Sequence, residues 1–197
     1  MTIEFTTANV ESPVVEFDYA VDDLQNLFDK YQTWGSNKEL NGLGYKNISK
    51  RLMCKRENIS SPAFDRFEQE LENSKLSLVE KFLEIDTQKR WPNISKSISK
   101  NMNIYLSLIT DLPGYSMSKH LDNRSVYAAG YLNIFDNESP TVINSTKKSI
   151  FRSGYRAPGE KGRGVIWLNT ENSWHQVNKV SQDRKTLMMS FQIVPWD

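Results

Sequence analysis

Residues 103–194 form a succession of short segments that are apolar or alternating and rich in β-branched and aromatic residues. Turn sequences such as Leu-Pro-Gly and Ser-Gln-Asp-Arg separate the segments. Evenly spaced strands with no helices between them are typical of an antiparallel sandwich or jelly roll, so we expect that architecture here. The eight expected strands are a short one around His120 and the segments 103–110, 125–134, 141–146, 149–156, 164–169, 174–180 and 186–194.

The start of the chain has a different pattern. Residues 3–17 are expected to be extended, because Pro13 argues against a helix there. Over residues 21–34 the apolar side chains recur at helical spacing, and two aspartates suit the start of a helix. The glycines that follow predict a loop.

The clearest helical pattern covers residues 61–85, where apolar side chains recur every three to four residues. Pro62 suits the first turn of this helix. Asn73-Ser74 could divide the region into two helices, and the polar segment 93–101 is expected to be a connector.

The chain has 197 residues, which is enough for one domain with a buried core and too few for two ordinary ones. We therefore expect a single domain, 1–197. In it, residues 1–100 would form a helical and extended support region and residues 101–197 a mainly β core.

Composition excludes some classes of protein. The net charge of +1, with acids and bases mixed along the chain, gives no reason to expect a nucleic-acid or membrane partner. The single cysteine, Cys54, cannot form an intramolecular disulfide, which fits a reducing compartment. The N-terminus lacks the pattern of a signal peptide, and no segment approaches the roughly 20 apolar residues of a membrane span. These features predict a cytoplasmic protein, and they give no oligomeric state.

The only two histidines, His120 and His175, are candidates for a shared metal site. In a strand, residues i and i+2 face the same side, so His120 and Asp122 would converge on one point. His175 would come from another strand, and in a jelly roll the seventh strand lies beside the second. Two histidines and one carboxylate form a set of ligands that leaves metal positions open for other molecules.

Arg184 stands nine residues after His175, at the start of the last expected strand. Thr186 would share its face. A guanidinium and a hydroxyl on one inward face can receive a carboxylate, because arginine offers bidentate hydrogen bonds that are reinforced by charge.

Each of these residues also has an ordinary structural interpretation. A His-x-Asp sequence can arise by chance, and His175 could be a buried, hydrogen-bonded histidine. Arg184 could be a solvated turn residue in an ion pair with Asp183. The order and spacing of the whole set favour a shared site over these separate explanations.

The sequence His120-Leu121-Asp122, followed by Tyr131-Leu132-Asn133, His175 and Arg184, resembles the 2-oxoglutarate/Fe(II)-dependent dioxygenases. Within that superfamily it is most similar to the prolyl-4-hydroxylase-like branch. The resemblance covers about half of the chain, from residue 101 onward. It implies a double-stranded β-helix of the jelly-roll or cupin-like kind, with helices packed outside.

The resemblance also implies roles for individual residues. His120, Asp122 and His175 would bind Fe(II), and Arg184 would bind the distal carboxylate of 2-oxoglutarate. The hydroxyl of Tyr131 could reach the same carboxylate, although an aromatic ring that fills the core is an equal interpretation. Weaker candidates for the cosubstrate pocket and its wall are Asn133, Thr186, Trp167, Trp174, Tyr105 and Tyr115.

Two features depart from the family pattern. The Gly-Gly pair that many members carry after Tyr-Leu-Asn is replaced by residues 135–140. The tyrosine that often precedes His-x-Asp by about ten residues has only Tyr105 and Tyr115 as imperfect substitutes. These departures leave the implied iron and cosubstrate sites intact and weaken the transfer of prolyl specificity.

The implied function is an Fe(II)- and 2-oxoglutarate-dependent hydroxylase. It would use O2 to convert 2-oxoglutarate to succinate and CO2, with ascorbate as a possible reductant. A protein or peptide side chain such as proline is the first expected substrate, and a small metabolite or sugar is the next. The alternative is a jelly-roll metal- or ligand-binding module without redox chemistry, in which Arg184 would not be required.

Overall fold

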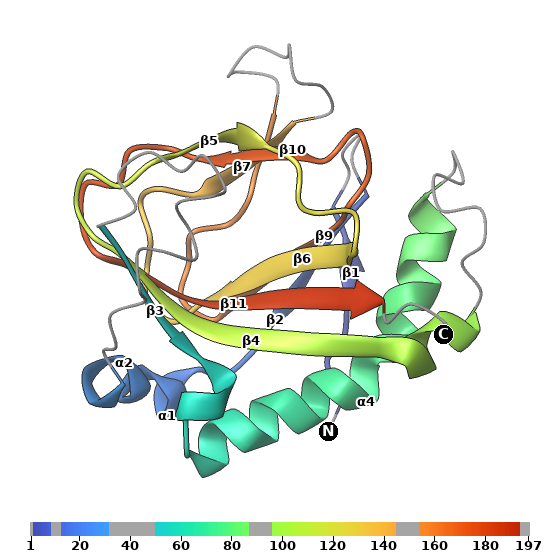
Figure 1. The fold of residues 1–197 in the computed structure, drawn as a ribbon, viewed down its shortest axis with the longest axis horizontal. Coiled ribbons are helices and arrows are strands. Elements are labelled where there is room, and N and C mark those ends of the chain that lie inside the picture. Colours follow the sequence, from blue (N-terminus) through green and yellow to red (C-terminus); the bar gives the residue numbers. More distant parts are fainter. Residues whose placement is uncertain (1, 9–12, 32–49, 87–95, 145–153, 194–197) are drawn as a thin grey trace.

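The computed structural model describes residues 2–8, 13–31, 50–86, 96–144 and 154–193. Its framework consists of two antiparallel sheets that face each other, with helices against the outer face of the larger sheet (Figure 1). The helical elements are α1 (Asp22–Gln25), α2 (Leu27–Lys30), η3 (Arg56–Asn58), α4 (Pro62–Ile85) and η4 (Lys96–Asn101). The strands are β1 (Thr6–Thr7), β2 (Val14–Asp18), β3 (Arg51–Lys55), β4 (Met102–Asp111), β5 (Met117–His120), β6 (Val126–Asn133), β7 (Thr141–Asn144), β8 (Tyr155–Arg156), β9 (Arg163–Leu168), β10 (Trp174–Val177) and β11 (Arg184–Ile193).

The strands from β4 to β11 confirm the mainly β, jelly-roll architecture that the sequence predicts. The larger sheet has the order β1-β2-β9-β6-β11-β4-β3, and the smaller sheet has the order β5-β10-β7-β8. Neighbouring strands are paired antiparallel, and β5 lies beside β10 as expected for the second and seventh strands of a jelly roll. Parts of three predicted strands, at 145–146, 149–153 and 194, lie outside the described residues.

The N-terminal half contributes more to the sheet than the sequence suggested. Strand β2 pairs with β9, and β3 pairs with β4 at the opposite edge of the larger sheet. The extended segment before residue 18 is therefore part of the sheet and not only a lead-in. Cys54 lies on β3 and is a buried free thiol.

Helix α4 is continuous, so Asn73-Ser74 does not divide this region into two helices. The hydroxyl of Ser74 donates to the carbonyl of Glu70 one turn earlier and accepts a hydrogen bond from the backbone N–H of Ile3. A serine hydroxyl that is satisfied within the helix does not need to interrupt it. At the start of the helix, the hydroxyl of Ser61 accepts from the N–H of Phe64.

The region predicted as a helix over 21–34 contains two short helices, α1 and α2, which are separated at Asn26. Residues 32–34 lie outside the described part of the chain, as do residues 93–95 of the predicted connector. The remainder of that connector forms the 3-10 helix η4. None of the helices in the described residues is long and apolar enough to span a bilayer.

The main hydrophobic core lies between α4 and the outer face of the larger sheet (Figure 1). Strand β11 shows how the sheet divides its side chains, since successive residues point to opposite faces. Its Leu187, Met189 and Phe191 pack in this core, whereas Arg184, Thr186 and Met188 line a cavity on the other face. The amphipathic pattern of α4 and the alternation of β11 thus direct the polar residues toward the space between the two sheets.

Gly130 lies on β6 where that strand approaches β9 closely. A Cβ atom at this position would lie 2.2 Å from the carbonyl oxygen of Val165 and 2.9 Å from the Cα of Ile166. Both contacts are with backbone in the middle of the larger sheet, so a rotamer change cannot relieve them. Only glycine fits here without a shift of one strand.

We expect Gly130→Ala to lower the free energy of unfolding by about 1–3 kcal/mol, because overpacking of a core has effects of that size. Gly130→Val should destabilise the protein further, since it adds two more carbon atoms to the same contact. Urea unfolding followed by circular dichroism measures both. An unchanged midpoint for both variants would show that β6 and β9 can separate more easily than this geometry implies.

Candidate metal centre and adjoining cavity

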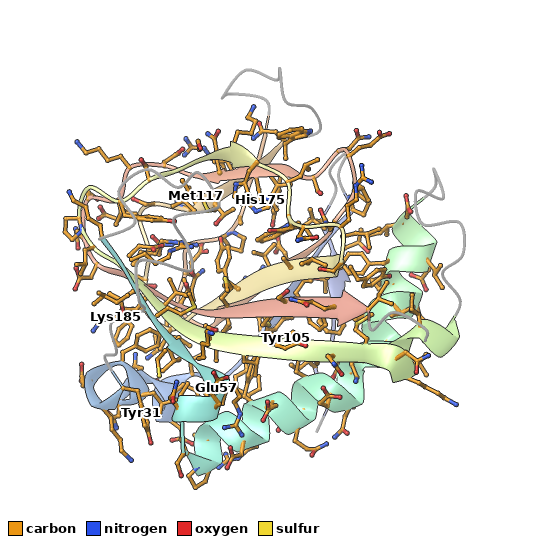
Figure 2. All side chains as sticks on the ribbon, viewed as in Figure 1. Tyr31, Glu57, Tyr105, Met117, His175 and Lys185 are labelled. Atoms are coloured by element: carbon orange, nitrogen blue, oxygen red, sulfur yellow. The ribbon has the colours of Figure 1, made fainter. Side chains whose placement is uncertain are left out.

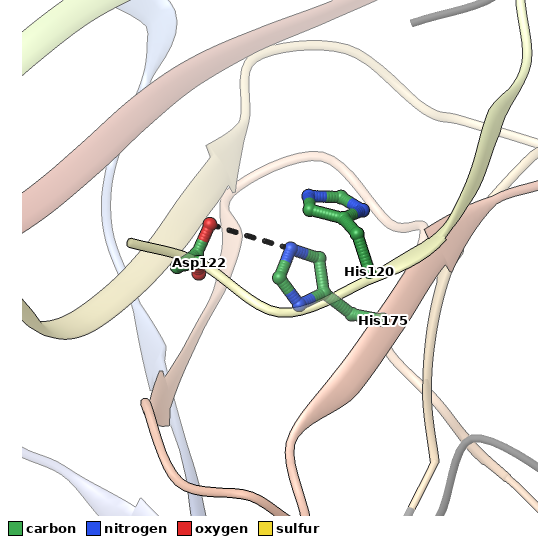
Figure 3. A group of neighbouring side chains, drawn as sticks. All are labelled: His120, Asp122 and His175. Carbon is green, nitrogen blue, oxygen red and sulfur yellow. Dashed lines mark ion pairs between the residues drawn. The ribbon is translucent and has the colours of Figure 1, made fainter. Parts of the chain in front are cut away.

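Two neighbouring strands of the smaller sheet bring the histidines together. His120 ends β5, His175 lies on β10, and the two residues are directly opposite each other in the pairing of these strands. Their ring centroids are 4.2 Å apart. Asp122 follows two residues after the end of β5, and its carboxylate turns back toward the rings (Figure 3).

The three side chains form a compact group of potential metal ligands. One ligand atom from each of His120, Asp122 and His175 lies within 4.8 Å of the others. The Nε2 of His175 is 3.6 Å from the Oδ1 of Asp122. Three ligands at about 2.1 Å from one ion stand roughly 3 Å apart in adjacent positions. Small side-chain rotations would therefore close this set around a metal.

Both imidazole rings are oriented by the main chain. The Nδ1–H of His120 donates to the carbonyl of Ser118 at 3.0 Å, and that of His175 donates to the carbonyl of Ser173 at 3.1 Å. A carbonyl oxygen only accepts, so each Nδ1 carries the proton and each Nε2 retains its lone pair. This arrangement is typical of metal-binding histidines.

The charge state of the group also suits a metal. Burial lowers the pKa of His175 below its usual value, although the carboxylate of Asp122 acts in the opposite direction. A neutral imidazole is the form that binds a metal. The indole Nε1–H of Trp167 donates to the Oδ2 of Asp122 at 3.3 Å and leaves Oδ1 directed at the histidines. The donor set therefore fits a divalent ion such as Fe(II).

The triad opens into a cavity of about 80 Å³ between the two sheets. Side chains from both sheets line this cavity. Its lining has two polar regions, one at the triad and the other at Arg184. The apolar part of its wall includes Ile109, Met117, Ala129, Val177 and Met188.

Arg184 is buried and begins β11, as the sequence predicts. It is not paired with Asp183; its Nη1 donates instead to Asp111 at 2.9 Å, and its Nη2 donates to the hydroxyl of Thr141 at 3.0 Å. Its Nε–H is buried and has no hydrogen-bond partner among the described residues. A buried donor without a partner is unfavourable, so an acceptor from a ligand would satisfy it.

Tyr131 lies beside this guanidinium, with its ring centroid 4.8 Å from the Cζ of Arg184. Burial raises the pKa of Tyr131, while the positive charge of Arg184 opposes the rise, so the phenol stays protonated at neutral pH. Its hydroxyl is buried and makes no hydrogen bond of ordinary geometry with a described residue. Thr186 also lines the cavity, two residues after Arg184 on the same face of β11.

The weaker candidates have different positions. Trp167 lines the cavity, and its ring centroid is 4.7 Å from that of His175. Trp174 does not line the cavity, because it precedes His175 on β10 and points to the other face. Asn133 is buried outside the cavity lining, where its amide donates to the carbonyl of Pro158.

The two tyrosines proposed as family substitutes do not line the cavity either. Tyr105 is 51% exposed on β4 (Figure 2). Tyr115 is fully buried, and the guanidinium of Arg51 lies over its ring, with the Cζ 4.4 Å from the centroid. Tyr115 therefore contacts Arg51, which lines the cavity, but does not line the cavity itself.

Three polar residues near the cavity were not singled out from the sequence as site residues: Arg51, Asp111 and Thr141. Arg51 lies in a segment with several basic residues, Lys50, Arg51, Lys55 and Arg56, a composition typical of a solvated surface. In the structure, however, Arg51 lines the cavity and forms a bidentate ion pair with Asp111 at 2.6 and 3.0 Å. Arg56, five residues later in the sequence, pairs with Asp65 and Glu68 instead. The periodicity of one segment cannot reveal such a pair, because its members come from strands that are distant in sequence.

The pH dependence of stability should reflect the Asp111 group. Burial would raise the pKa of Asp111, but the charges and hydrogen bonds of Arg51 and Arg184 outweigh it and hold the pKa below the usual 3.8. A carboxyl whose pKa is depressed in the folded state contributes stability above its unfolded pKa and loses it as the pH falls through the folded value.

We therefore expect Asp111→Asn to lower the free energy of unfolding at neutral pH by about 3–5 kcal/mol, the usual range for breaking a buried pair. The difference from the wild type should shrink as the pH falls below 3.8, because the carboxyl of the unfolded wild type is protonated first and that of the folded protein at still lower pH. Denaturant unfolding at a series of pH values tests this, with the exposed Asp183→Asn as control. A difference that stays constant down to the lowest pH would contradict the depressed pKa.

Comparisons with known proteins concern the fold. The sequence matches no protein-family model and no curated protein. Solved structures match over nearly the full chain. A prolyl-4-hydroxylase from Pseudomonas putida has a TM-score of 0.56 at 10% identity and covers 94% of this chain and 95% of its own. EvdO2 from Micromonospora carbonacea var. aurantiaca, in complex with 2-oxoglutarate, has a TM-score of 0.55 at 11% identity and covers 98% and 95%.

The viral collagen prolyl hydroxylase of Paramecium Bursaria Chlorella virus-1 has a TM-score of 0.54 at 12% identity and covers 98% of both chains. Identities this low establish the fold alone, and the fold is the same in all three proteins. It is also the fold that the resemblance in the sequence implies. The protein therefore has the fold of the prolyl-4-hydroxylase-like 2-oxoglutarate/Fe(II) oxygenases.

Proposed function

We propose that this protein is an Fe(II)- and 2-oxoglutarate-dependent dioxygenase. It would couple the oxidative decarboxylation of 2-oxoglutarate, to succinate and CO2, to the hydroxylation of a substrate. One observation carries the proposal: the triad His120, Asp122 and His175 lines the same cavity as Arg184. A metal site alone would not need a buried guanidinium in the same cavity.

In this proposal His120, Asp122 and His175 hold the iron, which supplies open positions for 2-oxoglutarate and O2 when it is bound. Arg184 binds the distal carboxylate, and its unpartnered Nε–H is one of the donors. The hydroxyls of Tyr131 and Thr186 stand beside that carboxylate. Ascorbate would serve only to keep the iron reduced.

The apolar wall of the cavity has a further role in this proposal. Side chains such as Ile109, Val177 and Met188 exclude water from the space between the triad and Arg184. Exclusion of water strengthens the interaction between the guanidinium and a carboxylate. It also protects a reactive centre from side reactions.

For the substrate, we propose a protein or peptide side chain such as proline first, and a small metabolite or sugar second. Support comes from the solved structures, since two of those with TM-scores above 0.5 are named as prolyl hydroxylases. Nucleic acid is not favoured, because the net charge is only +1. Incubation with proline-rich peptides, followed by mass spectrometry, would show a gain of one oxygen atom on the correct substrate.

We further propose that the chain acts as one domain in a reducing compartment such as the cytoplasm. Strands β2 and β3 from the first half belong to the same sheet as the strands of the second half, which supports one domain. Cys54 is a buried free thiol on β3, which fits a reducing compartment.

The first test is the formation of succinate from 2-oxoglutarate under air, with Fe(II) and ascorbate and without added substrate. We expect slow succinate formation by the wild type and none when the metal is chelated. If no succinate forms, anaerobic binding of 2-oxoglutarate to the metal-loaded protein distinguishes an enzyme that turns over only with its substrate from a protein that does not use 2-oxoglutarate. Absence of that binding as well would leave a non-catalytic metal- or ligand-binding module as the function.

A further inference from the structure

Arg184 does not stand alone at the polar end of the cavity. Arg51, Asp111 and Arg184 lie directly opposite one another on three adjacent strands, β3, β4 and β11. The side chain of Asp111 is 0% exposed, and those of Arg51 and Arg184 are 12% and 4% exposed. This group, Arg51–Asp111–Arg184, is therefore almost entirely removed from solvent. Charges interact more strongly in the protein interior than in water.

The carboxylate of Asp111 has a different relation to each arginine. Arg51 binds both of its oxygens, with Nε to Oδ1 at 2.6 Å and Nη2 to Oδ2 at 3.0 Å. Arg184 binds only Oδ2, through Nη1 at 2.9 Å. The bidentate geometry makes Arg51 the main counter-ion of Asp111, and Arg184 is the secondary partner.

This difference matters for a ligand that carries a carboxylate. A buried aspartate paired with Arg184 alone would neutralise the guanidinium and repel an incoming anion. Because Arg51 takes most of the interaction with Asp111, Arg184 keeps positive charge toward the cavity, together with the Nε–H that lacks a partner among the described residues. Asp111 and Thr141 meanwhile hold the two terminal nitrogens of Arg184 in place.

We propose that Arg51 and Asp111 are positioning residues of the 2-oxoglutarate site. Asp111 orients Arg184, and Arg51 offsets the charge of Asp111 so that Arg184 can bind the distal carboxylate. The inference rests on the proposed function. It also assigns a role to β3, because the N-terminal half supplies one of the charges on which the pocket depends.

The test is calorimetric titration of 2-oxoglutarate into the Mn(II)-loaded protein without oxygen, so that no turnover occurs. We expect Arg51→Gln to weaken binding by about 30-fold or more, the usual range for removing one partner of a buried charge pair. Arg51→Lys retains the charge and should weaken binding by less. The key variant is the double change Arg51→Gln with Asp111→Asn, which removes both charges of the pair and should restore most of the affinity.

Several controls separate this electrostatic role from a structural one. Lys185→Gln removes a positive charge from the same strand. Lys185 lies outside the cavity lining, with its Nζ 3.8 Å from the Oδ1 of Asp29, so binding should not change. Thermal unfolding and Mn(II) affinity show that each variant is folded with its metal site intact. A 2-oxoacid without the distal carboxylate should bind wild type and Arg51→Gln equally.

Three results would overturn the inference. One is wild-type affinity in the folded Arg51→Gln variant. Another is a folded double variant that binds no better than Arg51→Gln, since a packing defect is not rescued by a second change. The third is a wild type that binds no 2-oxoglutarate, which would refute the proposed function itself and is recognised before any variant is measured.

Discussion

Asp122→Ala is expected to lower the affinity for Fe(II) by more than about 100-fold, because even the outer partners of metal ligands contribute 10–100-fold. Succinate formation should fall to background. The carboxylate is the only anionic member of the triad, so its removal takes away the charge that would bind a divalent cation most strongly. His120→Ala should also lower the affinity for Fe(II) and the rate of succinate formation. Metal content after dialysis, measured by atomic emission, and succinate formation are the two measurements.

The matched control is Asp183→Ala, which removes a carboxylate from an exposed turn before β11. It should leave metal content and turnover unchanged. Circular dichroism must show that Asp122→Ala is folded, since Trp167 would lose its hydrogen-bond acceptor at Asp122. Full metal content and turnover in a folded Asp122→Ala protein would exclude the triad as the metal site.

Arg184→Gln is expected to raise the KM for 2-oxoglutarate by about 30-fold or more, which corresponds to the roughly 2–5 kcal/mol of a buried charge pair. The guanidinium is buried and offers donors to the cavity, whereas a glutamine amide is neutral and shorter. Metal affinity should change little, because Arg184 is not a ligand in the triad. The measurements are the steady-state KM for 2-oxoglutarate and the metal content of the same samples.

Lys185→Gln is again the matched control, since the residue is adjacent in sequence and points to the other face of β11. Arg184→Lys separates charge from geometry, because lysine keeps the charge and loses the planar set of donors. We expect Arg184→Lys to fall between Arg184→Gln and the wild type. An unchanged KM in both Arg184 variants would exclude Arg184 as the residue that binds the distal carboxylate.

Much of the candidate site could be predicted because its members follow local rules. His120 ends β5 and Asp122 follows two residues later, outside the strand, so the short spacing keeps the two side chains close although strand alternation does not extend to Asp122. Arg184 and Thr186 have the same spacing at the start of β11. The position of His175 follows from the strand order of a jelly roll, in which β10 lies beside β5. This pairing places His175 opposite His120.

The residues that sequence reasoning missed depend on pairings between distant segments. Arg51 reaches the cavity only because β3 pairs with β4, and nothing in residues 50–56 indicates a strand partner. Asp111 and Thr141 become part of the site because Arg184 turns toward them, across 73 and 43 residues of sequence. Such contacts are set by tertiary packing, so the pattern of a single segment carries no signal for them.

Two aromatic candidates, Trp174 and Tyr105, do not line the cavity, and the reason differs between them. Trp174 is adjacent to His175 and therefore faces away from the triad. Tyr105 has the same parity on β4 as Ile109, which lines the cavity. However, Tyr105 lies toward the other end of that long strand, where it is half exposed and does not line the cavity.

The bonds from the imidazole rings to the carbonyls of Ser118 and Ser173 have an evolutionary consequence. Many proteins fix the tautomer of a metal-binding histidine with a carboxylate side chain, which a single substitution can remove. Here the acceptors are main-chain oxygens, which every amino acid provides. Sequence drift at positions 118 and 173 can therefore leave the ring orientation intact. The residues that orient the ligands of such a centre therefore need no particular side chain, so they are difficult to recognise in the sequence even when the geometry is kept.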